Sequence, residues 1–193
     1  MLLEDYEVEP DLSEPGDLSA AELSMAVRDL WRDFHRSAFS IRVVSVPSPT
    51  EAEVEAAAGA GAVGRIAAGD FGENFPMDLT YWGVERYQAS WFRALKALER
   101  ADDAVSCLVS SITDPANSNF VSCWPLYRSG SVVHIQNSII FLEGIAEDFT
   151  PDEPWNFVEP RSTIDEDGNE ISEWQTSMDE VREFLRSVRS WAG

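Results

Sequence analysis

The fold is decided by the stretch NFVSCWPLYRSGSVVHIQNSIIF, which occupies residues 119–141. Two segments rich in β-branched and aromatic residues, 119–127 and 131–141, flank the turn-forming sequence RSGS. This pattern predicts a β-hairpin, because Gly and Ser permit a tight reversal and the flanking residues favour extended backbone. The preceding segment AVSCLVSSI (104–112) is also strand-like. The three strands together predict an antiparallel meander.

A long helix is predicted just before the meander, over residues 84–100. Tyr87, Trp91 and Leu95 recur every four residues, which places them on one face of a helix. Gly83 stands at the position of the helix N-cap.

A second helix is predicted at the C-terminal end of the chain, where Ser177 and Glu180 form an S-x-x-E capping box ahead of an apolar stripe. Capping boxes also open two predicted helices nearer the N-terminus, at residues 19–36 and about 51–58. The sequence GAGAVG (59–64) has the spacing of a dinucleotide-binding loop. It follows an Ala-rich helix instead of a strand, so it is interpreted as a helix stop and loop.

Three further strands are predicted at residues 39–46, 65–71 and 75–82, with a bend at Gly69. The predicted fold class is therefore α+β: a single domain whose antiparallel sheet, built from a meander and hairpins, packs with about three to four helices. The domain is expected to span residues 19–193, preceded by an acidic arm at 1–18.

The charge of the chain is strongly negative, with 35 acidic against 14 basic residues and a formal net charge of −21. This excess argues against binding to nucleic acid or to an anionic membrane, because both need a basic face. It favours a basic macromolecular partner, although acidity also serves solubility alone. No signal peptide and no apolar run long enough for a membrane helix is visible, so a cytoplasmic location is expected.

The acidic stretch STIDEDGNEISEW (162–174) is the best candidate for a metal loop, and it fails the test for calcium. Counted from Asp165 as the first position, an EF-hand needs Gly at the sixth position and Glu at the twelfth. Glu170 and Thr176 stand there instead. The stretch is better interpreted as a turn with Gly168 or Asn169 at positive φ, ahead of the last helix.

Catalytic and transition-metal patterns are equally weak. His35, His134, Cys107 and Cys123 show no close ligand spacing, and no nucleophile elbow occurs. Both Cys residues are interpreted as small buried residues and His134 as a structural or surface residue. The sequence predicts no catalytic residue, no cofactor and no metal site.

From about Gly64 to Leu185 the sequence resembles immunity proteins of bacterial contact-dependent growth inhibition and related polymorphic toxin systems. The resemblance rests on GRIAAGDFGENF, LTYWGVERYQASWFRAL, SSITDPANSNFVSCWPLY, VVHIQNSIIFL and DGNEISEWQTSMDEVREFL, in this order. It implies a cytoplasmic, non-enzymatic protein that binds and neutralises the toxin C-terminal domain encoded beside it. The acidity suggests a basic toxin, such as a nuclease, whose substrate-binding face the protein would cover.

Candidate partner-binding residues follow from exposure and charge. Most are acids expected in turns, and Trp124 and Trp155 are added as surface anchors because each stands beside Pro. The candidates are Asp70, Glu73, Asp102, Asp103, Trp124, Trp155, Asp165, Glu166, Asp167, Glu170 and Glu173. Core packing is expected for most of Tyr81, Trp82, Trp91 and Trp174.

Two alternatives remain open on the sequence: an enzyme or small-ligand-binding protein with a carboxylate-lined pocket, and a general acidic interaction module. The oligomeric state is not predicted.

Overall fold

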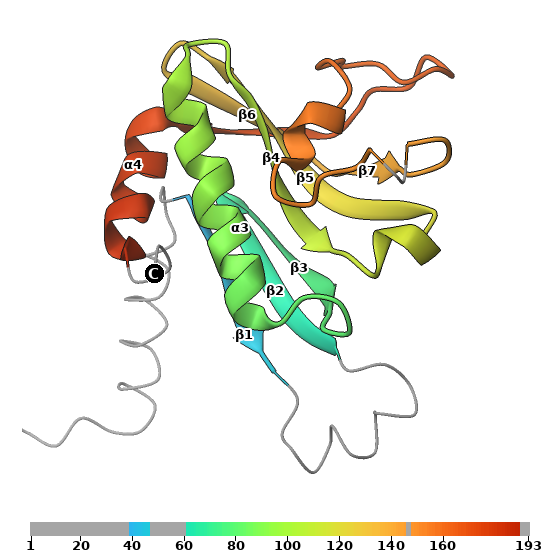
Figure 1. Ribbon diagram of the computed structural model, residues 1–193. Coiled ribbons are helices and arrows are strands. Elements are labelled where there is room, and N and C mark those ends of the chain that lie inside the picture. Colours follow the sequence, from blue (N-terminus) through green and yellow to red (C-terminus); the bar gives the residue numbers. More distant parts are fainter. Residues whose placement is uncertain (1–38, 47–60, 146–147, 190–193) are drawn as a thin grey trace, which may run out of the picture. The chain divides into compact units, whose positions relative to one another are not determined.

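The computed structural model describes residues 39–46, 61–145 and 148–189. These residues form an α+β fold in which two antiparallel sheets pack with helices (Figure 1). The predicted α+β class with antiparallel sheets is confirmed, but the described part of the chain has two sheets and only two α-helices, fewer than the three to four helices predicted. The arm at 1–18 and the helices predicted at 19–36 and 51–58 lie outside the described residues.

The first sheet has the order β1-β2-β3. Its strands are β1 (Ser40–Ser45), β2 (Gly61–Ala68) and β3 (Phe71–Asp78). The bend expected at Gly69 is a tight hairpin turn, in which Gly69 has a φ of 58°.

Two sequence predictions for this sheet are corrected. β2 begins at Gly61, inside the segment interpreted as a loop, and β3 covers Phe71–Asp78 instead of residues 75–82. The glycines explain the first difference. A Cβ atom on Gly64 would lie 2.3 Å from the Phe75 ring, so the absence of a side chain lets this ring lie flat against the neighbouring strand.

The second sheet has the order β4-β5-β6-β8, with β7 paired to β5, and it confirms the predicted meander. Its strands are β4 (Val105–Ser111), β5 (Phe120–Ser129), β6 (Val132–Gln136), β7 (Ser138–Phe141) and β8 (Glu173–Ser177).

The single strand predicted at 131–141 is interrupted at Asn137, which separates β6 from β7. The register does not shift across the interruption, because Leu126 faces Ile135 and Cys123 faces Ser138. Pro125 lies on β5 at this point and has no amide hydrogen to donate, which is consistent with the local loss of pairing.

Helix α3 (Val84–Ala97) lies across the sheets and is followed by the short helix η1 (Leu98–Arg100), as predicted (Figure 1). Tyr87 and Trp91 on its inner face are fully buried. The Tyr87 hydroxyl donates to the Asp78 carbonyl at 2.7 Å, and Trp91 Nε1 donates to the Val109 carbonyl at 2.7 Å. These bonds fix the helix to both sheets.

An aromatic cluster joins the two sheets. The Phe71 ring of the first sheet stacks on Trp174 of the second with centroids 3.7 Å apart, and Phe75 lies 6.3 Å from Trp124. Trp82 and Trp91 are buried as expected for most of the four aromatic residues, whereas Tyr81 is 43% exposed.

Helix α4 (Met178–Ser187) follows β8 directly and lies beside α3 (Figure 1). Its predicted capping box is confirmed: Glu180 N donates to Ser177 Oγ at 3.2 Å, and Ser177 N donates to Glu180 Oε2 at 3.0 Å. The described part of the segment between β7 and β8 contains the short helix η3 (Pro154–Phe157), several turns and one isolated β-bridge. A third short helix, η2 (Pro115–Asn117), precedes β5.

Candidate functional site

Residues 163–171 form a small hairpin, here called the acidic hairpin, immediately ahead of β8. Ile164 and Glu170 form an isolated antiparallel bridge, and Ile171 N donates to the Thr163 carbonyl at 2.9 Å. Gly168 has a φ of 86°, so the predicted turn with a positive-φ glycine is confirmed. In Figure 1 this orange-red segment reaches away from the helices.

The Asp165 carboxylate stabilises this turn by accepting hydrogen bonds from other residues of the turn. Its Oδ1 accepts from Asp167 N at 2.9 Å and from Asn169 N at 2.8 Å, while Asn169 Nδ2 lies 3.1 Å from its Oδ2. The side-chain bond from Asn169 is the largest of the effects that lower the pKa of Asp165. Asp165 is therefore committed to the turn, whereas Glu166, Asp167 and Glu170 are exposed on its surface.

Glu173 joins the base of the acidic hairpin to β6 in a cluster we call the Glu173 clamp. Arg161 binds it through two nitrogens at 2.7 Å, His134 Nδ1 lies 2.9 Å from its Oε1, and Gln136 Nε2 donates to its Oε2 at 3.0 Å. Gln136 also donates to the Ser162 carbonyl at 2.7 Å. The bonds from Arg161 are the main cause of the lowered pKa of Glu173.

The clamp corrects the prediction that Glu173 faces a partner. Its side chain is only 13% exposed, and both carboxylate oxygens already accept hydrogen bonds within the chain. The structural role expected for His134 is confirmed by its contact with this carboxylate.

Trp124 is also misplaced by the sequence prediction, because it is 1% exposed and lies among Phe71, Phe75 and Trp174. The neighbouring Pro125 suggests a sheet edge, but β5 is a central strand of the second sheet. Trp155 is partly exposed, with the Arg100 guanidinium 5.9 Å from its ring centroid. It remains a candidate.

The structure does not bring the remaining acids to the acidic hairpin. Asp102 and Asp103 lie at the turn that precedes β4, where Asp102 accepts from Arg128 at 2.6 Å and from Gly130 N through its carbonyl at 2.8 Å. Gly130 precedes β6, whereas the hairpin is held at the other end of that five-residue strand, roughly 13 Å away at about 3.3 Å per residue.

Asp70 and Glu73 belong to the hairpin of β2 and β3 in the first sheet. Of the candidate acids that are exposed, the acidic hairpin therefore holds Asp165, Glu166, Asp167 and Glu170.

An apolar patch beside the acidic hairpin was not predicted from the sequence. Phe120, Ile139 and Phe141 are 49%, 42% and 67% exposed. Phe120 faces Phe141 across the β5–β7 pair, and Ile139 lies two residues from Phe141, so the three side chains share one face. The sequence indicates the patch through the alternation of inward and outward residues in FVSC and SIIF. Because Val121 and Ile140 are buried, their neighbours on each strand point outward.

The patch and the acidic hairpin adjoin the same end of β6. Gln136, the last residue of β6, binds Ser162 at the base of the hairpin, and β7 begins two residues after Gln136. Among the described residues, the outer edge of β7 has no partner strand. Exposed aromatic side chains, nearby exposed carboxylates and an open strand edge are features of a protein-binding surface.

The alternative of a carboxylate-lined pocket gains no support from two hollows on the helical face. In both hollows the lining Lys and Arg residues outnumber the lining Asp and Glu residues, by four to two and by three to two. Within residues 39–46, 61–145 and 148–189, no group of three or more His, Cys, Asp or Glu side chains is placed to hold a metal ion. Neither described helix has the length and apolar character needed to span a membrane.

Three comparisons with known proteins agree with this architecture. The sequence model of the CdiI N-terminal domain family matches residues 77–184. The immunity protein CdiI of Enterobacter cloacae subsp. cloacae is 34% identical over 125 residues, which cover 65% of this chain and 85% of that protein. A chain of the CdiA-CT/CdiI toxin and immunity complex from Enterobacter cloacae superposes with a TM-score of 0.68 at 31% identity, covering 79% of this chain and 99% of that chain.

The fold thus defines a small α+β protein with two antiparallel sheets that pack with helices α3 and α4. The chain belongs to the CdiI N-terminal domain family. The resemblance to immunity proteins of contact-dependent growth inhibition is confirmed.

Proposed function

We propose that this protein is a cytoplasmic, non-enzymatic immunity protein that binds the toxin C-terminal domain encoded beside it and neutralises that domain. The observation that carries the proposal is its family membership. The curated relative is named an immunity protein, and the similar solved structure is a toxin and immunity complex.

The toxin is proposed to meet the acidic hairpin and the adjoining apolar patch. Phe120 and Phe141 provide the aromatic anchors that dominate the binding energy of many interfaces, and Glu166, Asp167 and Glu170 provide a charged rim. The Glu173 clamp keeps the rim in place relative to the patch, which lowers the entropy lost on binding.

The target is proposed to be a basic toxin domain, such as a nuclease. The formal net charge of −21 supports this choice, because an acidic inhibitor both attracts a nucleic-acid-binding face and blocks access to it. The association rate is then expected to fall steeply between low and physiological salt.

The proposal is tested by coexpressing the chain with the C-terminal domain encoded upstream and by measuring both copurification and protection of cells from the toxin. Stable copurification with protection is expected. A toxin domain that neither binds nor is inhibited would refute the proposed function.

The charged part of the proposed surface is tested with two double variants that change the net charge equally. Glu166→Lys with Asp167→Lys is compared with Asp70→Lys with Asp103→Lys, which changes the net charge equally at turns away from the hairpin. A slower association confined to the first variant supports the hairpin as the interface. Equal slowing would show that only the total charge acts.

The apolar patch is tested by Phe141→Ser, with Val44→Ser as its control, because Val44 is 44% exposed on β1 in the other sheet. Loss of an aromatic anchor worth about 2 kcal/mol weakens binding about 30-fold. A change of less than about threefold in Phe141→Ser would remove the patch from the interface.

A further inference from the structure

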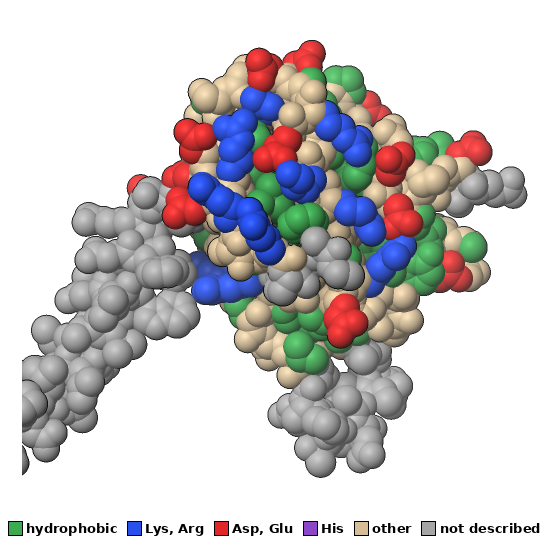
Figure 2. Space-filling view, turned by 60° about the vertical axis from the view of Figure 1, so that its left-hand side comes forward, with side chains coloured by type: hydrophobic (Ala, Val, Ile, Leu, Met, Phe, Trp, Pro, Cys, Tyr) green, Lys and Arg blue, Asp and Glu red, His purple; other side chains and the backbone are tan. Residues whose placement is uncertain are grey.

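The helical face of this acidic protein carries a concentration of positive charge. Seven of the 14 Lys and Arg residues lie on α3, η1 and α4 or directly after α4. They are Arg86, Arg93, Lys96, Arg100, Arg182, Arg186 and Arg189. Figure 2 shows blue side chains gathered over one face, with green side chains between them.

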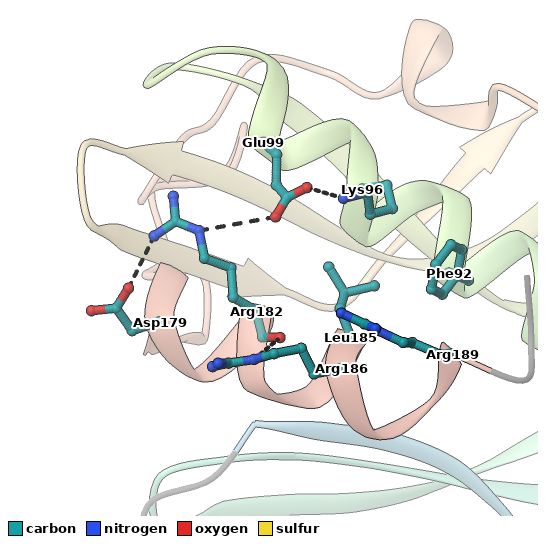
Figure 3. A pocket seen from close by; sticks show the side chains of 8 residues that line it. All are labelled: Phe92, Lys96, Glu99, Asp179, Arg182, Leu185, Arg186 and Arg189. Atoms are coloured by element: carbon teal, nitrogen blue, oxygen red, sulfur yellow. Dashed lines mark hydrogen bonds and ion pairs between the residues drawn. The ribbon is translucent and has the colours of Figure 1, made fainter.

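The positive charges surround a groove between α3 and α4, here called the basic groove. Its volume is about 530 Å³, and Phe92 and Leu185 give it an apolar floor. Lys96, Arg182 and Arg189 lie around this floor (Figure 3). A second hollow of about 530 Å³ shares Phe92 and Lys96 and continues the cationic lining on the far side of α3.

Internal ion pairs engage only some of these cations. Arg182 binds Asp179 at 2.9 Å and approaches Glu99 at 3.9 Å, and Glu99 also binds Lys96. Within the described part of the chain, no carboxylate lies within ion-pair distance of Arg186 or Arg189.

The same holds for Arg100, which faces the Trp155 ring instead. Across the two hollows six lining cations stand beside four lining carboxylates, Glu99, Asp152, Glu153 and Asp179. The excess of positive charge on this face is therefore available to a ligand.

We propose that the basic groove binds an acidic segment of a partner protein. An apolar side chain of the segment rests on Phe92 and Leu185, and flanking carboxylates bind Arg186 and Arg189, whose guanidinium groups match a carboxylate in two-pronged geometry. This surface lies on helices, whereas the proposed toxin interface lies on the β5–β7 pair and the acidic hairpin. The inference therefore does not depend on the proposed function.

The charge pattern favours an acidic peptide over a nucleic acid. A nucleic acid brings an unbroken series of phosphates, and Glu99 and Asp179 interrupt the cationic lining where those phosphates would lie. The net charge of −21 also repels a polyanion as a whole. A short segment with separated carboxylates carries fewer negative charges, so both costs are smaller for it.

The test is fluorescence anisotropy with a fluorescein-labelled peptide in which Glu and Asp alternate with Leu and Phe. Arg186→Glu is compared with Arg65→Glu, which makes the same charge change on β2 in the first sheet. Arg186→Glu is expected to weaken binding about tenfold or more, and Arg65→Glu less than about twofold. Phe92→Ala tests the apolar floor and is expected to weaken binding without changing its salt dependence.

Three results would overturn the inference: no peptide binding at low salt, equal weakening by both Arg variants, or tighter binding of a labelled single-stranded oligonucleotide of the same length. Toxin binding by Arg186→Glu is measured in parallel and is expected to be unchanged.

Discussion

Replacing Glu173 with Gln removes one negative charge from the Glu173 clamp and leaves the shape of the side chain almost intact. The wild-type carboxylate accepts two bonds from Arg161 at 2.7 Å, with His134 and Gln136 at 2.9 and 3.0 Å. In the variant, one of the two terminal positions becomes an NH₂ group that faces donors instead of accepting from them. The variant is therefore expected to be less stable.

The size of the effect follows from the exposure of the two main partners. A hydrogen bond to a charged group contributes about 1.5–3 kcal/mol, and an exposed ion pair less than about 1 kcal/mol. The Glu173 side chain is 13% exposed and that of Arg161 is 36% exposed, so the pair lies between these limits. We expect Glu173→Gln to lower the free energy of unfolding by about 2 kcal/mol, which corresponds to a Tm lower by about 4–8 °C for a chain of this size.

The assay is urea unfolding at about pH 7, followed by Trp fluorescence and by circular dichroism. Glu170→Gln is the control, because this exposed acid of the same hairpin carries no clamp contact. It is expected to change stability by less than about 0.5 kcal/mol. Equal stability of Glu173→Gln and the wild type would refute the account of the clamp.

The stability difference between the wild type and Glu173→Gln is also expected to depend on pH. The pKa of Glu173 is lowered in the folded protein from its ordinary value of 4.5, mainly by the hydrogen bonds from Arg161. Its contribution is therefore present above 4.5 and is lost as the pH falls through the folded pKa. The difference in unfolding free energy is expected to shrink as the pH falls below 4.5, and a difference that stays constant as the pH is lowered through this range contradicts the electrostatic explanation.

Three further changes test other parts of the fold. Ser177→Ala removes the hydroxyl that caps Glu180 N at the start of α4, and urea unfolding should show a loss of about 1 kcal/mol. Burial raises the pKa of Tyr87 and Tyr127 from 10.0 to about 12, so their ultraviolet titration should fall near pH 12 and stability should be lost between pH 10 and 12, as the unfolded chain ionises first. Gly168→Ala strains a residue with a φ of 86° by about 1–2 kcal/mol, and faster amide hydrogen exchange within the acidic hairpin should reveal it.

The sequence predicted the elements whose signals are local. The meander, α3, the capping box of α4 and the turn at Gly168 each follow from spacing or from the backbone freedom of single residues. None of these features requires knowledge of what packs against the element, and all are confirmed.

The failures concern contacts that only the folded chain defines. Gly64 was assigned to a loop because Gly is frequent in loops, but here it lets the Phe75 ring approach β2. Trp124 was assigned to the surface because Pro125 follows it, but β4 and β6 flank this strand. Gly and Pro each occur in more than one structural setting, and in both cases the prediction followed the more frequent setting.

For a similar reason, the sequence could identify only part of the candidate partner-binding surface. The acids of the hairpin could be found because Gly168 identifies the turn that exposes them. Glu173 could not be excluded, because its partner Arg161 lies 12 residues away and His134 lies 39 residues away, and nothing in the sequence pairs them.

The net charge explains the last difference between expectation and structure. A value of −21 describes the protein at distances beyond the Debye length, about 8 Å at physiological salt, and there it favours encounter with a basic partner. Inside that distance the local arrangement decides, and α3 and α4 place their cations around an apolar floor. Arg186 and Arg189 are therefore placed to bind a carboxylate of a partner, although this protein itself is acidic overall. The net charge therefore affects how fast a partner associates. The local arrangement of charges in the basic groove determines which chemical groups bind after association.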